Sequence, residues 1–272
     1  MTSAERILVA TDLAPASDLA MRAAVARAPA PRGRVAVFHV CDDGAGGAAR
    51  VRAHLRDVIA APDADALDVI VRDGDPAEQI AAVAEQWHAD LVVLGEPVHA
   101  SGVLGRLFRP RVVEQVLRHA PCRVLVTREE PGSGVILVGV DVDERSPVLG
   151  AAARELALRG GEAVIAHWIS PVGIARPAVG DAAIPITPWE NLAASALPAL
   201  EQAAHDAKLT GDVRVVAGDP GNGLCELAAQ LHADLVVVGT HSRRGIARIA
   251  LGSVAEHVAN HAPCSVLVVR IE

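Results

Sequence analysis

Glycines and polar side chains gather in one segment of the second half that could hold an anion. The segment follows the apolar run Leu235–Val238 and reads Gly-Thr-His-Ser-Arg-Arg-Gly-Ile-Ala-Arg-Ile-Ala-Leu-Gly-Ser-Val over residues 239–254. Because glycine has no Cβ, Gly239 would let the backbone turn close to a ligand. Gly252 and Ser253 open a helical stretch, whose free N–H groups and positive dipole end favour an anion. On residues alone, the segment is either an anion site or an ordinary strand-to-helix loop.

Other candidate side chains also stand directly after apolar runs, where ligands bind in open parallel sheets. Asp12 and Asp141 follow the first such run of each half. His39 and His167 end the second run of each half, and they either border a pocket or have a structural role. His241 is the one base near the loop that could serve a hydrolytic reaction.

The elements that must position these residues occur twice in the chain, as a sequence repeat. His88–Gly95 returns as His232–Gly239, and Gly74-Asp75-Pro76 returns as Gly218-Asp219-Pro220. His119-Ala120-Pro121-Cys122 likewise returns as His261-Ala262-Pro263-Cys264. A repeat of about half the chain has the size of a domain. We therefore expect two domains, residues 1–130 and 131–272, joined at the Pro/Gly-rich stretch 129–134.

Each half alternates short apolar runs with helical stretches, which predicts an α/β fold with a doubly wound, five-stranded parallel sheet in each domain. Asp75-Pro76 and Asp219-Pro220 have the N-cap and first-turn residues of a helix start, and Ser146-Pro147 is a third such start. The ten expected strands are Ile7–Ala10, Val35–Val40, Leu67–Val71, Leu91–Leu94, Arg123–Thr127, Val135–Val140, Ala163–Trp168, Val213–Val216, Leu235–Val238 and Val266–Val269.

Composition excludes several classes of function. The net charge is −8 and only 2% of residues are aromatic, which argues against a nucleic-acid binder. No apolar run is long enough to span a bilayer and no signal peptide precedes the first strand, so we expect a cytoplasmic protein. The four cysteines lack metal or disulfide spacing, and Cys122 and Cys264 are expected to be buried thiols. Histidines at helix ends are expected to cap them rather than to bind metal.

The second half resembles the universal stress protein family. That family's nucleotide loop is Gly, two residues, Gly, nine residues, and then Gly followed by Ser or Thr. Gly239, Gly252 and Ser253 match in type and spacing, and Ser242 stands where the second glycine is expected. With the internal repeat, the resemblance covers nearly the whole chain as a tandem two-domain member.

This resemblance implies an adenine-nucleotide site in the second half. The aspartate after the first strand and the backbone of the second strand would hold adenine and ribose, and the Gly-Ser loop would hold the phosphates. The ligand would be ATP, ADP or AMP, with or without Mg²⁺. The residues implied are Asp141, Trp168, Val238, Gly239, Ser242, Gly252, Ser253 and Val254.

The first half departs further from the family pattern. Pro110-Arg111 stands where the second half has Gly252-Ser253, and proline lacks the N–H that a phosphate would need. Glu96 adds a negative charge near the turn. Asp12 and Val40 remain, so half an adenine pocket is expected there without its phosphate cradle, and nucleotide is expected in the second half only.

Three functions stay open at this stage. The first is a nucleotide-binding module of the stress-response type without catalytic residues, the second an enzyme that hydrolyses ATP slowly, and the third a nucleotide-free interaction protein. The resemblance also implies an intramolecular pseudo-dimer in which the fifth strands, Arg123–Thr127 and Ser265–Arg270, cover each other's edges. It allows a homodimer of the chain and a protein partner that the sequence does not identify. The Pro-rich stretch 170–188 either covers a pocket or partner or is a surface excursion.

Overall fold

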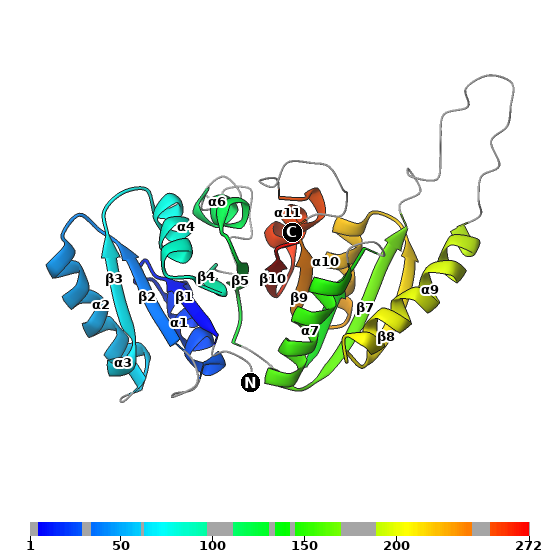
Figure 1. Ribbon diagram of the computed structural model, residues 1–272, viewed down its shortest axis with the longest axis horizontal. Coiled ribbons are helices and arrows are strands. Elements are labelled where there is room, and N and C mark those ends of the chain that lie inside the picture. Colours follow the sequence, from blue (N-terminus) through cyan, green and yellow to red (C-terminus); the bar gives the residue numbers. More distant parts are fainter. Residues whose placement is uncertain are drawn as a thin grey trace, which may run out of the picture. The chain divides into compact units, whose positions relative to one another are not determined.

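Two compact units make up the chain. The computed structural model describes residues 5–28, 34–60, 63–96, 111–130, 134–141, 145–169, 189–240 and 251–271, and Figure 1 shows its elements. The first unit runs to Pro131 and includes the last strand, β10 (Ser265–Val269). The second unit begins at Gly132 and includes the last helix, α11 (Ser253–His261). Each unit has its own site, so each is described separately.

A parallel sheet forms the centre of the first unit. Its strand order is β3-β2-β1-β4-β5, with parallel pairing throughout. The strands β1, β2 and β4 are buried over most of their length, which explains why they read as continuous apolar runs. The five strands expected from the sequence are confirmed as β1 (Arg6–Ala10), β2 (Arg34–Val40), β3 (Asp68–Arg72), β4 (Leu91–Gly95) and β5 (Arg123–Thr127).

Helices cover both faces of this sheet (Figure 1). One layer has α1 against α2, and the other has α4 against α6. The polar turn after β1 therefore leads into the first layer. The helices are α1 (Pro15–Arg27), α2 (Gly44–Val58), the short α3 (Asp63–Ala66), α4 (Pro76–Gln86) and α6 (Arg111–His119).

The second unit repeats this arrangement. Its sheet has the parallel order β9-β6-β7-β8, which corresponds to β4-β1-β2-β3 of the first unit. Helix α7 packs with α9, and α10 packs with α11. The strands are β6 (Val135–Gly139), β7 (Glu162–Ile169), β8 (Gly211–Ala217) and β9 (Ala233–Gly239), and the helices are α7 (Arg145–Arg159), α9 (Trp189–Asp206), α10 (Pro220–Gln230) and α11.

The fifth strand of the second repeat lies against the fifth strand of the first. Strand β10 pairs antiparallel with β5, with Val268 opposite Val124 and Leu267 opposite Leu125. Both strands are apolar and almost fully buried, so pairing them removes an exposed sheet edge. The pairing of the two fifth strands is thus confirmed, and the first unit gains a sixth, antiparallel strand.

Two of the three predicted helix starts are correct. Asp75 accepts hydrogen bonds from the backbone N–H groups of Ala77 (2.9 Å) and Glu78 (3.1 Å), and Asp219 accepts one from Asn222 (2.8 Å). The third was wrong by one or two residues, because α7 already begins at Arg145. Proline is tolerated in a first turn, so Pro147 does not have to mark the helix start.

Histidines end several helices, although not in the way expected for all of them. His88 and His232 have positive φ angles of 52° and 49°, the left-handed conformation that closes a helix. The N–H of His88 donates to the Glu85 carbonyl at 3.0 Å, so its backbone rather than its ring makes the cap. His119 Nδ1 and His261 Nδ1 do bind carbonyl oxygens one turn earlier, each at 2.8 Å.

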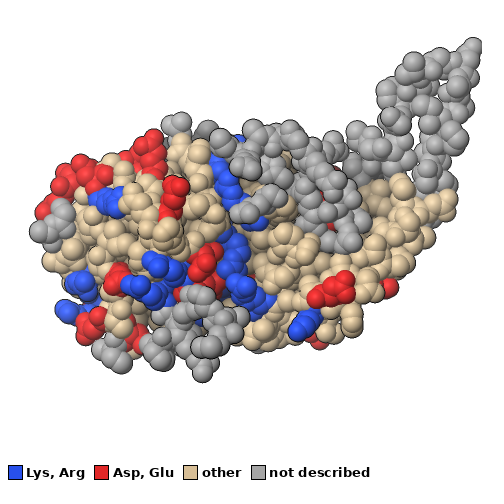
Figure 2. All heavy atoms as spheres, in the orientation of Figure 1, with Lys and Arg blue, Asp and Glu red and all other residues tan. Residues whose placement is uncertain are grey.

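Charges are mixed on the visible surface of the first unit. On the face in Figure 2, Lys and Arg side chains are interspersed with Asp and Glu side chains. The exposed pairs Arg34–Asp68 and Arg56–Asp65 each have an N–O distance of 3.3 Å. Among the described helices, none is both long and apolar enough to cross a membrane.

Candidate functional site

One cavity of the second unit collects the candidate residues. It has a volume of about 130 Å³ and lies at the carboxyl ends of β6, β7 and β9, beside the start of α11. Ser242 lies outside the described residues. The other seven candidates all line this cavity: Asp141, Trp168, Val238, Gly239, Gly252, Ser253 and Val254.

Backbone pairing fixes the end of β6 against β7 at this cavity. The N–H of Val140 donates to the Ala166 carbonyl at 3.0 Å, and His167 Nδ1 donates to the Val140 carbonyl at 2.9 Å. A carbonyl only accepts, so Nδ1 carries a hydrogen. His167 therefore fills both roles left open by the sequence, because it holds the strand ends together and also lines the cavity beside Asp141.

The Trp168 indole narrows the cavity. It lies against the first turns of α10, where a Cβ built on Gly223 would be 2.2 Å from Trp168 Nε1. Only a glycine leaves room for the ring at this point. In the first unit, Val40 matches Trp168 and Gln79 matches Gly223. The larger side chain is therefore on the helix there, and the smaller one is on the strand.

Gly239 has a packing role in addition to its place in the cavity wall. A Cβ at this position would be 2.4 Å from Ile271 Cδ1 and 3.1 Å from Val148 Cγ2. The glycine therefore gives room to two protein side chains, and it also lines the cavity. Gly95 ends β4 in the same place, where a Cβ would be 1.9 Å from the Ala16 carbonyl oxygen. The shared glycine reflects close packing of each sheet against the residues around it.

Helix α11 begins with backbone donors at the cavity wall. Gly252 is its N-cap residue, with φ −64° and ψ 146°, and no side chain caps it within the described part of the chain. The Gly252 carbonyl accepts from Glu256 N–H at 2.9 Å, so the first helical turn is formed. The amides of Ser253 and Val254 lie at the positive end of this helix, which favours a negatively charged group.

Thr240 holds the two ends of the loop together, a role the sequence did not reveal. Its carbonyl accepts the Gly252 N–H at 2.5 Å, and its hydroxyl accepts the Ile271 N–H at 3.2 Å. The side chain is only 7% exposed. Thr240 and Ile271 also line the cavity. The position of Thr240 directly after the shared glycine was the available signal.

The first unit has a cavity in the same place. Its volume is about 430 Å³, and it lies at the carboxyl ends of β1, β2 and β4 beside α6. Asp12 and His39 line it at the positions that Asp141 and His167 occupy in the second unit. The smaller Val40 in place of Trp168 is consistent with its greater volume. Helix α6 begins at Arg111, which matches Ser253 as the first helical residue.

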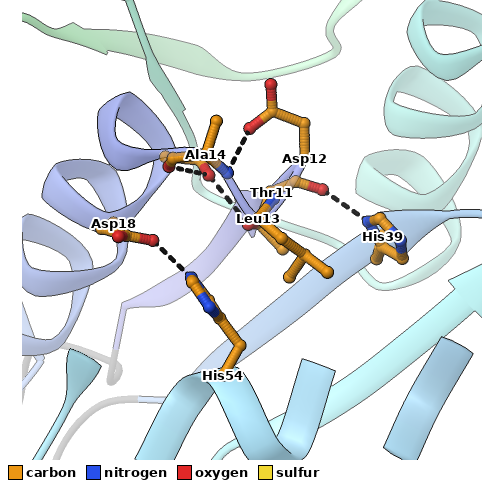
Figure 3. A network of polar contacts seen from close by, with 8 residues as sticks. Thr11, Asp12, Leu13, Ala14, Asp18, His39 and His54 are labelled. Carbon is orange, nitrogen blue, oxygen red and sulfur yellow. Dashed lines mark hydrogen bonds and ion pairs between the residues drawn. The ribbon is translucent and has the colours of Figure 1, made fainter. Parts of the chain in front are cut away.

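Hydrogen bonds order the turn that carries Asp12 (Figure 3). Asp12 Oδ1 accepts the Ala14 N–H at 3.0 Å, and the Thr11 hydroxyl accepts the Leu13 N–H at 2.9 Å. Leu13 has a positive φ of 63°, which is uncommon for a side chain of this size and marks a tight turn. His39 Nδ1 donates to the Thr11 carbonyl at 2.8 Å. In the second unit, His167 Nδ1 makes the matching hydrogen bond to the Val140 carbonyl. The turn therefore presents a fixed carboxylate beside an oriented imidazole.

The negative charge of Glu96 does not act at the turn as expected. Glu96 and Arg128 are each 8% exposed, and their Oε2 and Nη2 atoms are 2.5 Å apart. Arg128 Nη1 also donates to the Cys264 carbonyl at 3.0 Å. The arginine neutralises Glu96, so the carboxylate is a structural group of the β5–β10 region.

No cysteine is among the described residues that line either cavity. Cys264 is 2% exposed, as expected for a buried thiol. Cys122 is only partly buried, which differs from the expectation, although desolvation still raises the pKa of its thiol to about 12. Among the described residues, no three His, Cys, Asp or Glu side chains lie close enough to hold a metal ion.

Comparison with known proteins gives one family. The sequence model of the universal stress protein family matches residues 3–128 and 133–270. A universal stress protein of Mycolicibacterium smegmatis is 33% identical over 197 residues, which are 67% of this chain and 62% of that protein. One from Methanocaldococcus jannaschii is 40% identical over 75 residues, 28% of this chain and 44% of its own length. The chain thus spans less than two thirds of these two relatives.

Solved structures show the same fold over both repeats. A functionally unknown protein of Pseudomonas aeruginosa has a TM-score of 0.73 at 18% identity, over 99% of this chain and 93% of its own. A universal stress protein of Archaeoglobus fulgidus has a TM-score of 0.67 at 17% identity, over 98% of this chain and 96% of its own.

Proposed function

This chain belongs to the universal stress protein family, and we propose that its second unit binds one adenine nucleotide and acts as a stress-response binding module. The observation that carries the proposal is the gathering of seven separately predicted residues around one cavity. These residues come from three strand ends and one helix start. Residues as far apart in sequence as Asp141 and Ser253 meet there.

The lining groups suit the parts of an adenine nucleotide. The Asp141 carboxylate accepts hydrogen bonds, as the ribose hydroxyls require of a partner. The amides of Ser253 and Val254 and the Ser253 hydroxyl donate them, as phosphate oxygens require. The carboxyl ends of parallel strands are also where ligands bind in this class of fold. A Mg²⁺ ion that accompanies the nucleotide would take its ligands mainly from phosphate and water.

The volume of the cavity limits how the nucleotide enters. Small-molecule pockets usually measure roughly 300–1,000 Å³, and this one measures about 130 Å³ within the described residues. The Trp168 indole occupies part of the space that Val40 leaves open in the first unit. We therefore expect Trp168 to shift on binding, which would change its fluorescence.

Slow hydrolysis is the second candidate function, and no described residue favours it. A general base must lie within hydrogen-bond reach of the attacking water. In the described part of the cavity, His167 and Asp141 are the titratable groups, and they lie at the strand ends rather than at the helix start. His241, the base named from sequence, lies outside the described residues. We expect binding with at most slow turnover.

Mass spectrometry of the denatured, freshly purified protein tests the proposal. We expect ATP, ADP or AMP to be released from the wild-type chain and to be absent from the Gly252→Asp variant. Nucleotide-free protein that also fails to bind ATP in a titration would support an interaction protein instead. A phosphate-release assay with many turnovers per second, lost in His241→Ala, would support an enzyme.

A further inference from the structure

Trp168 fills a space beside the start of helix α10. The helix packs against β7, the strand that carries Trp168 (Figure 1). A Cβ built on Gly223 would collide with Trp168 Nε1, and one built on Gly218 would be 3.9 Å from Trp168 Cδ1. The indole therefore lies against the first turns of α10 and close to the glycine turn before it. Glycine is less favourable than alanine inside a helix, and the packed indole explains why Gly223 is present there.

The first unit fills the corresponding space from its helix instead of its strand. A Cβ built on Gly74, in the turn before α4, would be 3.2 Å from Gln79 Nε2 and 3.4 Å from Gln79 Cγ. Gln79 is the counterpart of Gly223, and the counterpart of Trp168 is Val40. The large and the small residue have thus changed places together. Two linked changes of this kind indicate that one space is filled in both units.

The exchange matters for the cavity of the second unit because the strand side chain faces it. Trp168 lines that cavity together with Pro220 and Leu224 of α10. Gln79 is not among the described residues that line the cavity of the first unit. An indole held against α10 therefore occupies space at the cavity wall, whereas the large residue of the first unit does not.

From this arrangement we propose that Trp168 is an aromatic gate of the cavity in the second unit. The surface formed by Gly218 and Gly223 holds the indole in the closed position. A ligand that needs the space of the indole binds only in the minor state in which the ring has left α10. The inference rests on the proposed function, because the ligand that the gate regulates is the adenine nucleotide of the second unit.

Such a gate lowers the observed affinity without changing the contacts of the bound ligand. The observed dissociation constant is the intrinsic one divided by the fraction of protein in the open state. A minor conformation is typically populated to roughly 0.1–10%. Removing the gate should therefore increase the affinity by at least about 10-fold.

Calorimetric titration of the full chain with ATP tests the gate in the Trp168→Val/Gly223→Gln variant. The variant copies the pair of the first unit, so that Gln fills the space that the indole leaves. We expect ATP to bind at least about 10-fold more tightly than to the wild type. Val40→Trp with Gln79→Gly makes the reverse exchange in the first unit, and this control should leave the ATP affinity of the second unit unchanged.

Tryptophan fluorescence follows the indole in a chain that keeps it. The chain has three tryptophans, so Trp87→Phe with Trp189→Phe leaves Trp168 as the only one. Saturating ATP should make its fluorescence easier to quench with acrylamide, because the ring leaves its packed position. An indole that stacks on the base instead would become harder to quench. This measurement decides alone if the exchange variant does not fold.

Two results would overturn the gate. One is an ATP affinity of the Trp168→Val/Gly223→Gln variant that is equal to or lower than that of the wild type. The other is an indole that ATP leaves unchanged or protects from acrylamide. In both cases ATP binding by the wild type would leave the nucleotide proposal standing. If neither the wild type nor the exchange variant binds ATP, the nucleotide proposal fails and the gate fails with it.

Discussion

Trp168 and Gly223 form a pair whose two members depend on each other. Alanine in a helix is usually more stable than glycine by about 1 kcal/mol, but a Cβ at Gly223 would be 2.2 Å from Trp168 Nε1. We expect Gly223→Ala to destabilise the wild-type chain and to stabilise the Trp168→Val variant by up to about 1 kcal/mol. Urea unfolding of the four proteins of this double-mutant cycle measures the coupling. An equal effect in both backgrounds would mean that the ring does not pack on Gly223.

His257 predicts a pH dependence of stability near the α10–α11 contact. Burial, and then the neighbouring His261, lower the pKa of His257 below its usual value. The rings of the two histidines stack at a centroid distance of 4.2 Å. The unfolded chain therefore binds the proton more readily than the folded chain.

The stability that His257 contributes is thus present above its ordinary pKa of about 6.5 and decreases as the pH falls through the lower folded pKa. We expect thermal unfolding of His257→Asn to depend less on pH between about 7 and 5 than that of the wild type. A wild-type midpoint that rises on acidification, and rises less in the variant, would contradict the direction of this shift.

Single residues show what the sequence predicts and what it cannot. Asp141, Gly252 and Ser253 could be placed at one site because strand ends and helix starts follow from local patterns. The packing role of Gly239 could not be predicted, since it depends on Ile271 from the end of the chain. Glu96 could not be paired with Arg128 from sequence either, because their contact joins residues after two different strands.

Aspartate caps start α4 and α10, and each should contribute measurably to stability. Asp75 accepts two backbone hydrogen bonds and Asp219 accepts one. Replacing an N-cap aspartate by alanine typically costs about 1 kcal/mol. We expect Asp75→Ala to lower the free energy of unfolding by at least as much as Asp219→Ala does, measured by urea unfolding. A change near zero for both variants would show that the caps are dispensable.

At the scale of elements, all ten strands could be predicted because each is a short apolar run. The pairing of the strands was harder to predict, since a run of Val and Leu does not indicate which strand lies beside it. The edge argument identified β5 with β10, and their antiparallel direction appears only in the structure. Helix α9 (Trp189–Asp206) is the second helix of the repeat, but its bounds were not predicted, and it continues through Pro198.

At the scale of the whole molecule, duplication has given two cavities with the same polar residues but different volumes and different helix starts. The strand-end Asp and His are shared, while Trp168 and Gly252 in the second unit correspond to Val40 and Pro110 in the first. These differences predict one nucleotide per chain.

Gly252→Asp separates binding from folding. The residue has φ −64° and ψ 146°, extended backbone that any residue adopts, and aspartate is a favoured N-cap. The variant should therefore keep its stability or gain a few tenths of a kcal/mol. Its carboxylate would lie at the helix start and repel a phosphate. Pro110→Asp changes the matching position of the first unit and serves as the control.

Calorimetric titration of the full chain with ATP is the most direct test of the nucleotide proposal. We predict one site per chain, an affinity at least about 100-fold lower in Gly252→Asp because two or more charge-assisted hydrogen bonds are lost, and unchanged binding in Pro110→Asp. Two equal sites, binding that survives Gly252→Asp, or binding lost in Pro110→Asp instead would contradict the assignment of the nucleotide to the second unit.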